Sequence, residues 1–158
     1  MIDIYSKGKY PANVLSNFSS NSFVLDGVQC ASMEGFLQSL KFWRKKKQQD
    51  ICKLSGIEAK QAANTFVNIR WKLIQTLRWQ GKVYKRGSSV YTMLLTRAFD
   101  ALSTNNAFCK ALVATNNEAL CHSIGKHNRK DTVLTEEEFI EQLYRIRKII
   151  SRKGGAVV

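Results

Sequence analysis

The chain has 158 residues, 44% of them hydrophobic and one a proline, which excludes an intrinsically disordered protein and is long enough for one sizeable core. No apolar run approaches the roughly 20 residues that cross a bilayer, and the first residues lack the layout of a signal peptide, so we expect a cytoplasmic protein without membrane contact. The formal net charge of +13 favours an anionic partner such as nucleic acid, a phosphorylated metabolite or a dinucleotide, although solubility alone can also account for it.

The first predicted elements are a hairpin and a helix. Residues 13–29 alternate apolar and polar side chains around Asp26-Gly27, a turn signal that predicts two short strands. Ser32 is a suitable N-cap for a helix that we expect to run to about residue 46. Lys45–Lys47 would then lie at the carboxyl end of this helix, where positive side chains are favoured.

The middle of the chain is predicted to be mostly helical. Residues 55–58 read Ser-Gly-Ile-Glu, a capping box that predicts a helix to about residue 67. Residues 69–79 are rich in apolar side chains, and their pattern fits either a helix or a strand. Ser88 caps the clearest amphipathic helix. Its apolar stripe consists of Tyr91, Leu94, Leu95, Ala98, Phe99 and Leu102.

The last third is predicted to contain two helices separated by a loop. Residues 106–113 form a short helix, and residues 119–134 form an irregular loop with a possible strand. Thr135-Glu-Glu-Glu138 is a second capping box and opens a helix to about residue 147. We therefore expect an α+β fold, one helix-rich domain over residues 1–150 with a small antiparallel sheet, followed by a flexible basic tail at residues 151–158.

The four cysteines give no metal-binding pattern. They form no C-x-x-C pair, and only His122 lies beside one of them, so a zinc site or a thiol enzyme is poorly supported. In a reducing cytosol we expect free and mostly buried thiols.

The helix after the hairpin has an unusual polar column. Glu34, Gln38 and Lys41 follow at spacings of four and three, which places them on one helix face. The opposite side consists of Phe36, Leu37, Leu40 and Trp43, where a core would lie. A carboxylate, an amide and an amine in one column suggest a built site. The same spacing also occurs as an ion-pair ladder on a solvated helix face.

Short motifs along most of residues 5–147 follow one another in a specific order. They are Leu15-Ser-Asn-Phe18, Asp26-Gly27, Ser32-Met-Glu34, Gln38-x-x-Lys41-Phe42, Ser55-Gly-x-Glu-Ala-Lys60, Ala98-Phe-x-Ala-Leu102 and Leu112-Val-Ala-Thr115. In order and spacing the chain resembles the NADAR family of YbiA-like proteins. Its His122-Ser-Ile-Gly-Lys126 segment, where many members have W-G-x-G, is similar to that of a variant branch.

The resemblance implies an N-glycosidase that cleaves the bond between a ribose and an exocyclic amine, without a metal or cofactor. Substrate classes in the family include ADP-ribose attached to guanine in nucleic acid and ribosylamino-pyrimidine intermediates of riboflavin synthesis. The charge of +13 modestly favours ADP-ribosylated nucleic acid over a ribosylated nucleotide as the substrate partner. The alternative is a non-catalytic module that binds nucleic acid or an ADP-ribose or NAD-type dinucleotide in the same pocket.

For an enzyme of this kind we assign roles to the polar column. Lys41 would form an imine with the sugar, Glu34 would act as general acid and base, and Gln38 would orient the ribose hydroxyls. An imine requires a lysine that is neutral part of the time, which burial or nearby cations provide by lowering the pKa. Direct hydrolysis, with Glu34 activating water and Lys41 only binding substrate, is the alternative.

Further residues are expected to bind substrate. Asn17 would donate or accept hydrogen bonds, and Phe18 would stack on the substrate or pack in the core, both from the strand before the site. His122, Gly125 and Lys126 lie in a loop that would face the site, where a glycine beside a lysine suits a phosphate.

Two more substrate contacts are expected further along the chain. The tryptophan that family members usually carry at the start of the long helix is missing here. Trp79 is our candidate for an aromatic near the base, and Arg86 for a guanidinium near a phosphate.

Overall fold

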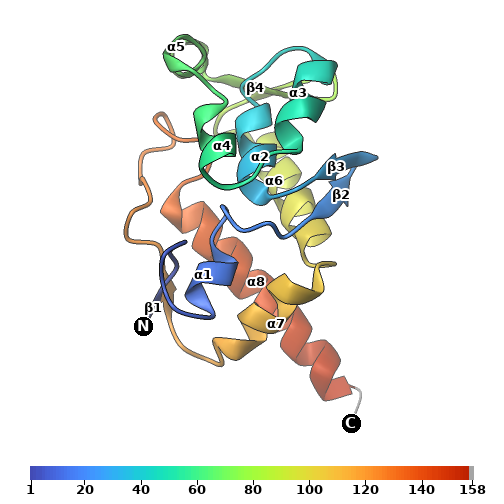
Figure 1. Cartoon of the computed structure of the whole chain (residues 1–158), viewed down its shortest axis with the longest axis vertical. Helices are drawn as coiled ribbons and strands as arrows, with labels where there is room; N and C mark the ends of the chain where they lie inside the picture. Colours follow the sequence, from blue (N-terminus) through green and yellow to red (C-terminus); the bar gives the residue numbers. More distant parts are fainter. Residues whose placement is uncertain (157–158) are drawn as a thin grey trace.

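The computed structural model describes residues 1–156 of the chain, which form short helices, small two-stranded sheets and one long helix (Figure 1). The helices are α1 (Ala12–Leu15), α2 (Met33–Ser39), α3 (Lys45–Cys52), α4 (Gly56–Gln61), α5 (Thr65–Ile74), α6 (Ser89–Leu102), α7 (Asn106–Ala114) and α8 (Glu136–Ala156). The strands are β1 (Ile2–Asp3), β2 (Phe23–Leu25), β3 (Val28–Cys30), β4 (Thr76–Trp79), β5 (Lys82–Lys85) and β6 (Leu120–Cys121). A single helix-rich α+β domain is confirmed, and none of the described helices is both long and apolar enough to cross a membrane.

The small sheet is divided into three pairs of strands. Strands β2 and β3 pair antiparallel, as do β4 and β5, whereas β1 and β6 pair parallel. The hairpin turn is confirmed: Asp26 and Gly27 have φ of 50° and 78°, the two positive values that a type I′ turn requires. The first strand of this hairpin, β2, is shorter than predicted and begins at Phe23. Residues 12–15, at the start of the predicted strand, form α1 instead.

Helix α2 starts where predicted and ends earlier. The Ser32 hydroxyl accepts a hydrogen bond from the Gly35 amide at 3.0 Å, which confirms the N-cap. The helix ends at Ser39 instead of residue 46, and the chain turns before Lys45–Lys47, which form the first turn of α3. The basic run therefore lies at the positive end of a helix, opposite to the prediction.

A buried glutamine caps the carboxyl end of α2 near Ser39. Gln48, from α3, donates from Nε2 to the carbonyl oxygens of Ser39 (3.2 Å), Phe42 (2.9 Å) and Arg78 (2.6 Å). Its Oε1 accepts from the amide of Gln80 at 3.2 Å. Since buried backbone groups need partners, this amide satisfies the end of α2, the turn after it and strand β4 at once.

Two helices and a strand replace the predicted elements between residues 55 and 79. Helix α4 begins after Ser55 as expected, but the predicted capping box is absent, since the Ser55 hydroxyl accepts from Ser20 at 3.2 Å and makes no cap bond, and the helix ends at Gln61. Asn64 then caps α5, with its side chain accepting from the Val67 amide at 2.9 Å. Gln75 ends α5 in the left-handed conformation, at φ 54°, and β4 follows directly. Residues 69–79 are thus a helix end and a strand.

The last helices carry most of the predicted local signals. Ser88 caps α6 through the Tyr91 amide (3.2 Å), and all six residues of the predicted apolar stripe are buried. Thr135 and Glu138 form the reciprocal capping box of α8, at 3.1 and 2.8 Å. Helix α8 continues past residue 147 to Ala156, so the tail predicted over residues 151–158 is helical as far as it is described, and residues 157 and 158 lie outside the described residues.

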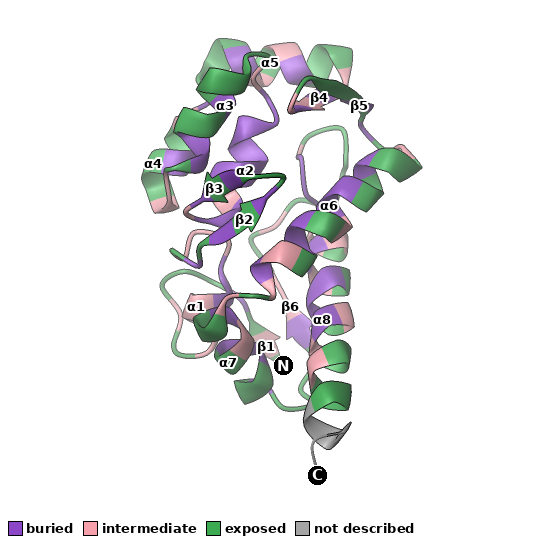
Figure 2. Cartoon of the chain, turned by 90° about the vertical axis from the view of Figure 1, so that its right-hand side faces the viewer, coloured by how far each residue is buried: buried purple, intermediate pink, exposed green. Residues whose placement is uncertain are grey.

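Helix α2 lies at the centre of one half of the molecule. Figure 2 shows it almost entirely buried, whereas α3, α4 and α5 around it have exposed outer faces. The other half consists of α1, α7 and α8, and the chain between β6 and α8 runs along the side of both halves (Figure 1). Gly35 permits the close approach in the first half, since a Cβ there would lie 2.6 Å from the carbonyl oxygen of Leu54.

The bonding of Gln48 predicts a large effect from a substitution of similar volume. Gln48→Met removes the amide and takes a hydrogen bond from four backbone groups, of which the Ser39 oxygen keeps a bond from the Phe42 amide. We expect this loss to lower the free energy of unfolding by about 3 kcal/mol. Urea denaturation measures this, with Gln49→Met on the exposed face of the same helix as control, expected within about 0.5 kcal/mol of the unsubstituted protein. Equal stability of the two variants would contradict the role given to Gln48.

Candidate active site

A cavity of about 330 Å³ lies between α2, α5 and the loop before α8. The predicted site residues that line it are Asn17, Phe18, Glu34, Gln38, Lys41, His122, Gly125 and Lys126. Three segments far apart in the sequence, around residues 17, 38 and 124, therefore meet at one place. Asn17 and Phe18 do so from the loop after α1 and not from a strand, which corrects that part of the prediction.

Lys41 is buried beside this cavity with a neutral partner. It follows the end of α2, and its amide donates to the carbonyl oxygen of Gln38 at 3.2 Å, which keeps the helical turn going. Its side chain is 9% exposed, and Nζ donates to Oδ1 of Asn68 at 2.8 Å. Asn68 is itself held by a bond from Nδ2 to the carbonyl oxygen of Ala63 at 3.1 Å, so the amide oxygen stays directed at the lysine.

The surroundings disfavour the charged form of this lysine. The pKa of Lys41 is lowered to about 8, chiefly by burial and also by the charges of Lys72, Lys126 and Lys60, while Glu34 acts in the opposite direction. An amide oxygen accepts from both the ammonium and the neutral amine, so Asn68 positions Nζ without supplying the negative charge that would restore the usual pKa.

Glu34 and Gln38 complete the polar column on α2. The backbone amide of Glu34 donates to the carbonyl oxygen of Asn17 at 3.0 Å, which holds the loop against the first turn of the helix. Its Oε1 accepts from Nε2 of Gln38 at 3.0 Å. Glu34 and Lys41 form no ion pair with each other, and both line the cavity. The alternative of an ion-pair ladder on a solvated helix face therefore does not describe the column. The carboxylate and the amine are both available to a ligand.

His122 and Gly125 form a tightly packed corner of the cavity. Nδ1 of His122 lies 2.8 Å from the carbonyl oxygen of Ile4. Because a carbonyl only accepts, Nδ1 carries the hydrogen of this bond, which fixes the orientation of the ring. A Cβ on Gly125 would lie 2.7 Å from Cδ2 of His122, so a side chain at this position would displace the ring.

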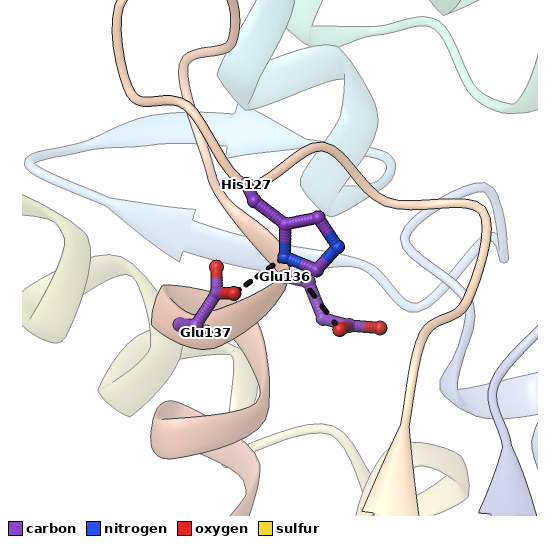
Figure 3. Close-up of side chains that lie close together, drawn as sticks. All are labelled: His127, Glu136 and Glu137. Atoms are coloured by element: carbon purple, nitrogen blue, oxygen red, sulfur yellow. Dashed lines mark hydrogen bonds and ion pairs between the residues drawn. The ribbon is translucent and has the colours of Figure 1, made fainter.

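The loop that carries Gly125 and Lys126 is fastened to the start of α8. Glu136 accepts from the His122 amide at 2.7 Å, and Nδ1 of His127 lies 2.5 Å from Oε1 of Glu137 (Figure 3). The bond to Glu137 raises the pKa of His127, and the pKa of Glu137 is lowered in turn. Although His127, Glu136 and Glu137 have the spacing of metal ligands, these contacts account for their arrangement.

Three exposed lysines line the cavity, two of them without a predicted role. Lys60 and Lys72 are exposed residues of the cavity wall, together with Lys126. Asp131 and Glu34 are the acidic residues of the described lining. The balance of charge is positive, which suits a phosphorylated ligand. Asn68 and Lys72 had no motif of their own, since their importance comes from where α5 is packed.

Two predicted contacts lie elsewhere in the structure. Trp79 is 1% exposed, packs edge-on against Phe36 with ring centroids 4.9 Å apart, and donates from Nε1 to Asp26 at 2.8 Å. Arg86 is buried in a bidentate ion pair, in which Nη2 and Nη1 donate to the two carboxylate oxygens of Glu138 at 2.7 and 3.1 Å. Neither residue lines the cavity, so both predictions were wrong: these side chains are partners of other protein groups.

Arg86 nevertheless supports the site indirectly. Its Nε donates at 2.9 Å to the carbonyl oxygen of Thr132, a residue of the cavity wall. The ion pair with Glu138 therefore ties the wall to the first turn of α8.

Asn68→Asp is expected to raise the pKa of Lys41 well above 8, because a carboxylate in place of the amide favours the ammonium. The pH at which Lys41 becomes reactive towards an acetylating reagent, followed by mass spectrometry of its peptide, measures this. Asn106→Asp, an exposed residue of α7, is the matched control and should leave the midpoint in place. Equal midpoints in the two variants would contradict the assignment.

Lys41→Met is expected to stabilise the protein at pH 7. The pKa of Lys41 is lower folded (about 8) than unfolded (10.5), so the unfolded chain binds more protons in between and stability rises with pH over that range. Below pH 8 the buried charge costs up to about 3 kcal/mol, which methionine removes. Denaturation at pH 7 and pH 11 should show the gain at the lower pH and its loss at the higher; a destabilised variant at pH 7 would contradict the burial argument.

Comparison with known proteins agrees with this architecture. The family model described as bacteriophage protein GP30.3 matches residues 9–148. A 17.1 kDa protein from the Gp30–rIII intergenic region of Enterobacteria phage T4 is 38% identical over 148 residues, which cover 92% of this chain and 96% of the relative. The solution structure of YbiA from E. coli covers 97% of this chain and 86% of its own, with a TM-score of 0.62 and 17% identity. The chain therefore belongs to the bacteriophage GP30.3 family, and its fold is that of the YbiA-like NADAR proteins.

Proposed function

We propose that this protein is an N-glycosidase that separates a ribose from an exocyclic amine, with ADP-ribosylated guanine in nucleic acid as the first candidate substrate and ribosylamino-pyrimidine phosphates as the second. The observation that carries the proposal is the buried amine of Lys41, held by a neutral acceptor in a cavity that also contains the carboxylate of Glu34.

The lowered pKa supports a nucleophilic role for Lys41. At a pKa of about 8, roughly one lysine in ten is neutral at pH 7, whereas at the ordinary lysine pKa fewer than about one in a thousand would be. The difference increases the concentration of reactive amine by roughly two orders of magnitude. Imine formation at neutral pH requires such a shift.

The proposed reaction begins with opening of the sugar. The lone pair of the glycosidic nitrogen forms a double bond to the anomeric carbon, the bond from that carbon to the ring oxygen breaks, and protonated Glu34 supplies a proton to the oxygen. The neutral Lys41 amine then adds to the anomeric carbon. After a proton moves from Lys41 to the exocyclic nitrogen, the free base leaves and a lysine imine remains.

Water completes the proposed cycle. It adds to the imine carbon while the Glu34 carboxylate accepts a proton, and collapse of the resulting carbinolamine releases the sugar aldehyde and restores Lys41. One water is consumed for each free base and free sugar produced. In the competing scheme, direct hydrolysis, Glu34 activates water and no bond to Lys41 forms.

The remaining cavity residues suit binding. Oε1 of Gln38 is buried and has no partner within the described residues, so a ribose hydroxyl would satisfy it. Lys60, Lys72 and Lys126 place positive charge around the opening, where phosphates of the substrate would lie. His122 also lines the cavity and can contribute a ring nitrogen to substrate binding.

The test is turnover of defined substrates by variants of the two central residues. We expect wild type to release free base from DNA carrying ADP-ribosylated guanine, with products identified by mass. Glu34→Gln should reduce the rate about 10²–10⁴-fold, and Lys41→Met should abolish turnover. Lys110→Met, an exposed lysine of α7, controls for loss of charge and should leave the rate unchanged.

Borohydride separates the two schemes. Reduction during turnover should trap the sugar on the Lys41 peptide, whereas direct hydrolysis leaves no adduct. If wild type released neither base nor sugar from either substrate class, the protein would instead be a binding module that uses the same cavity.

A further inference from the structure

An exposed tryptophan next to the cavity is in contact with two arginines. Trp43 follows Lys41 by two residues and is 48% exposed, although the predicted helix would have buried it. The guanidinium carbons of Arg70, from α5, and Arg78, from β4, lie 4.4 and 4.5 Å from the centroid of its ring. We refer to Trp43, Arg70 and Arg78 as the Trp43 cluster.

The two guanidinium groups have no acidic partner within residues 1–153. Other arginines of the chain do form ion pairs: Arg86 with Glu138, Arg97 with Asp26 and Arg145 with Asp100. In the Trp43 cluster, Arg70 donates from Nη2 to the backbone oxygen of Lys41 at 3.1 Å. Two positive groups thus lie on one ring without an acidic partner among the described residues, an arrangement that an anion would stabilise.

The surface around the cluster is basic and contains exposed apolar side chains. Arg44, Lys45 and Lys47 are exposed at the start of α3, whose amino-terminal end adds to the positive potential. Phe66 is 69% exposed, and its ring centroid lies 5.9 Å from the guanidinium of Arg70. Cationic groups interleaved with exposed aromatic rings are typical of surfaces that bind single-stranded nucleic acid.

The cluster is continuous with the candidate site. Arg70 belongs to the same helix as Asn68 and Lys72, which line the cavity, and it bonds to the backbone of Lys41 itself. A strand that contacts Trp43 would therefore place a neighbouring nucleotide close to the reactive amine.

We propose that the Trp43 cluster binds single-stranded nucleic acid, with Arg70 and Arg78 on phosphates and the exposed rings of Trp43 and Phe66 against unpaired bases. The bases of a duplex are stacked on one another and present no faces to these rings, which favours the single strand. The proposal names the polymer as the substrate class for the proposed N-glycosidase and in that respect rests on the proposed function.

The test uses an unmodified oligodeoxythymidine, which contains no bond for the enzyme to cleave. Binding is followed by fluorescence anisotropy of the labelled strand and by tryptophan emission. Trp71 and Trp79 are only 2% and 1% exposed, so quenching on titration reports on Trp43. Trp43→Ala and Arg78→Ala should each weaken binding about tenfold, and Trp43→Phe should retain most of the affinity.

The matched control for Arg78→Ala is Arg152→Ala, which removes the same charge from the exposed part of α8 and should change affinity less than about twofold. The dependence of the logarithm of affinity on that of salt concentration should also decrease by about one for Arg78→Ala. Circular dichroism of each variant checks that the fold is intact.

Three results would overturn the proposal: wild-type affinity in both Trp43→Ala and Arg78→Ala, losses no greater than that of Arg152→Ala, or tighter binding of the corresponding duplex. Because no catalysis is involved, these results are separate from those on turnover. Failure to cleave ADP-ribosylated DNA alongside cluster-dependent binding would refute the N-glycosidase and leave the surface in place.

Discussion

The geometry of the candidate site depends on one buried side-chain amide. Gln48 bonds to the end of α2, to the turn that follows and to two residues of the β4–β5 hairpin. Lys41 lies in the last helical turn and lines the cavity, and because α2 stops there, Trp43 emerges at the surface. The same bonds bring β4, and with it Arg78, against the turn. The position of Lys41 and the proposed nucleic-acid surface thus both depend on Gln48.

The surroundings of Lys41 in the cavity disfavour its charged form. Lys41 is buried among other lysines and paired with an amide, although a carboxylate would have held its charge more firmly. Structural lysines are normally exposed or paired with acids, so an arrangement that works against the ammonium is typical of a functional residue. Glu34, the acid of the proposed reaction, is hydrogen-bonded to Gln38 and forms no ion pair with the lysine.

Local signals in the sequence were sufficient for much of the fold. The Asp26-Gly27 turn, the Ser32 and Ser88 caps and the Thr135–Glu138 box depend on residues within a few positions, and all are confirmed. The predictions fail where a side chain's position depends on a partner far away in the sequence. The polar column was found because its helical spacing is local, whereas Asn68 lies 27 residues from the lysine that it positions. Arg86 was misassigned because Glu138, 52 residues away, already occupies its guanidinium.

The loop between β6 and α8 connects the cavity wall to its surroundings through exposed charges. The raised pKa of His127 means that its attraction to Glu137 is complete in mildly acidic solution and is lost as the pH rises through that pKa. Dissolved ions also weaken a contact so open to water. Alkaline conditions therefore have two opposed consequences: they deprotonate the amine of Lys41, as the proposed attack requires, and they loosen the segment that forms one wall of the cavity.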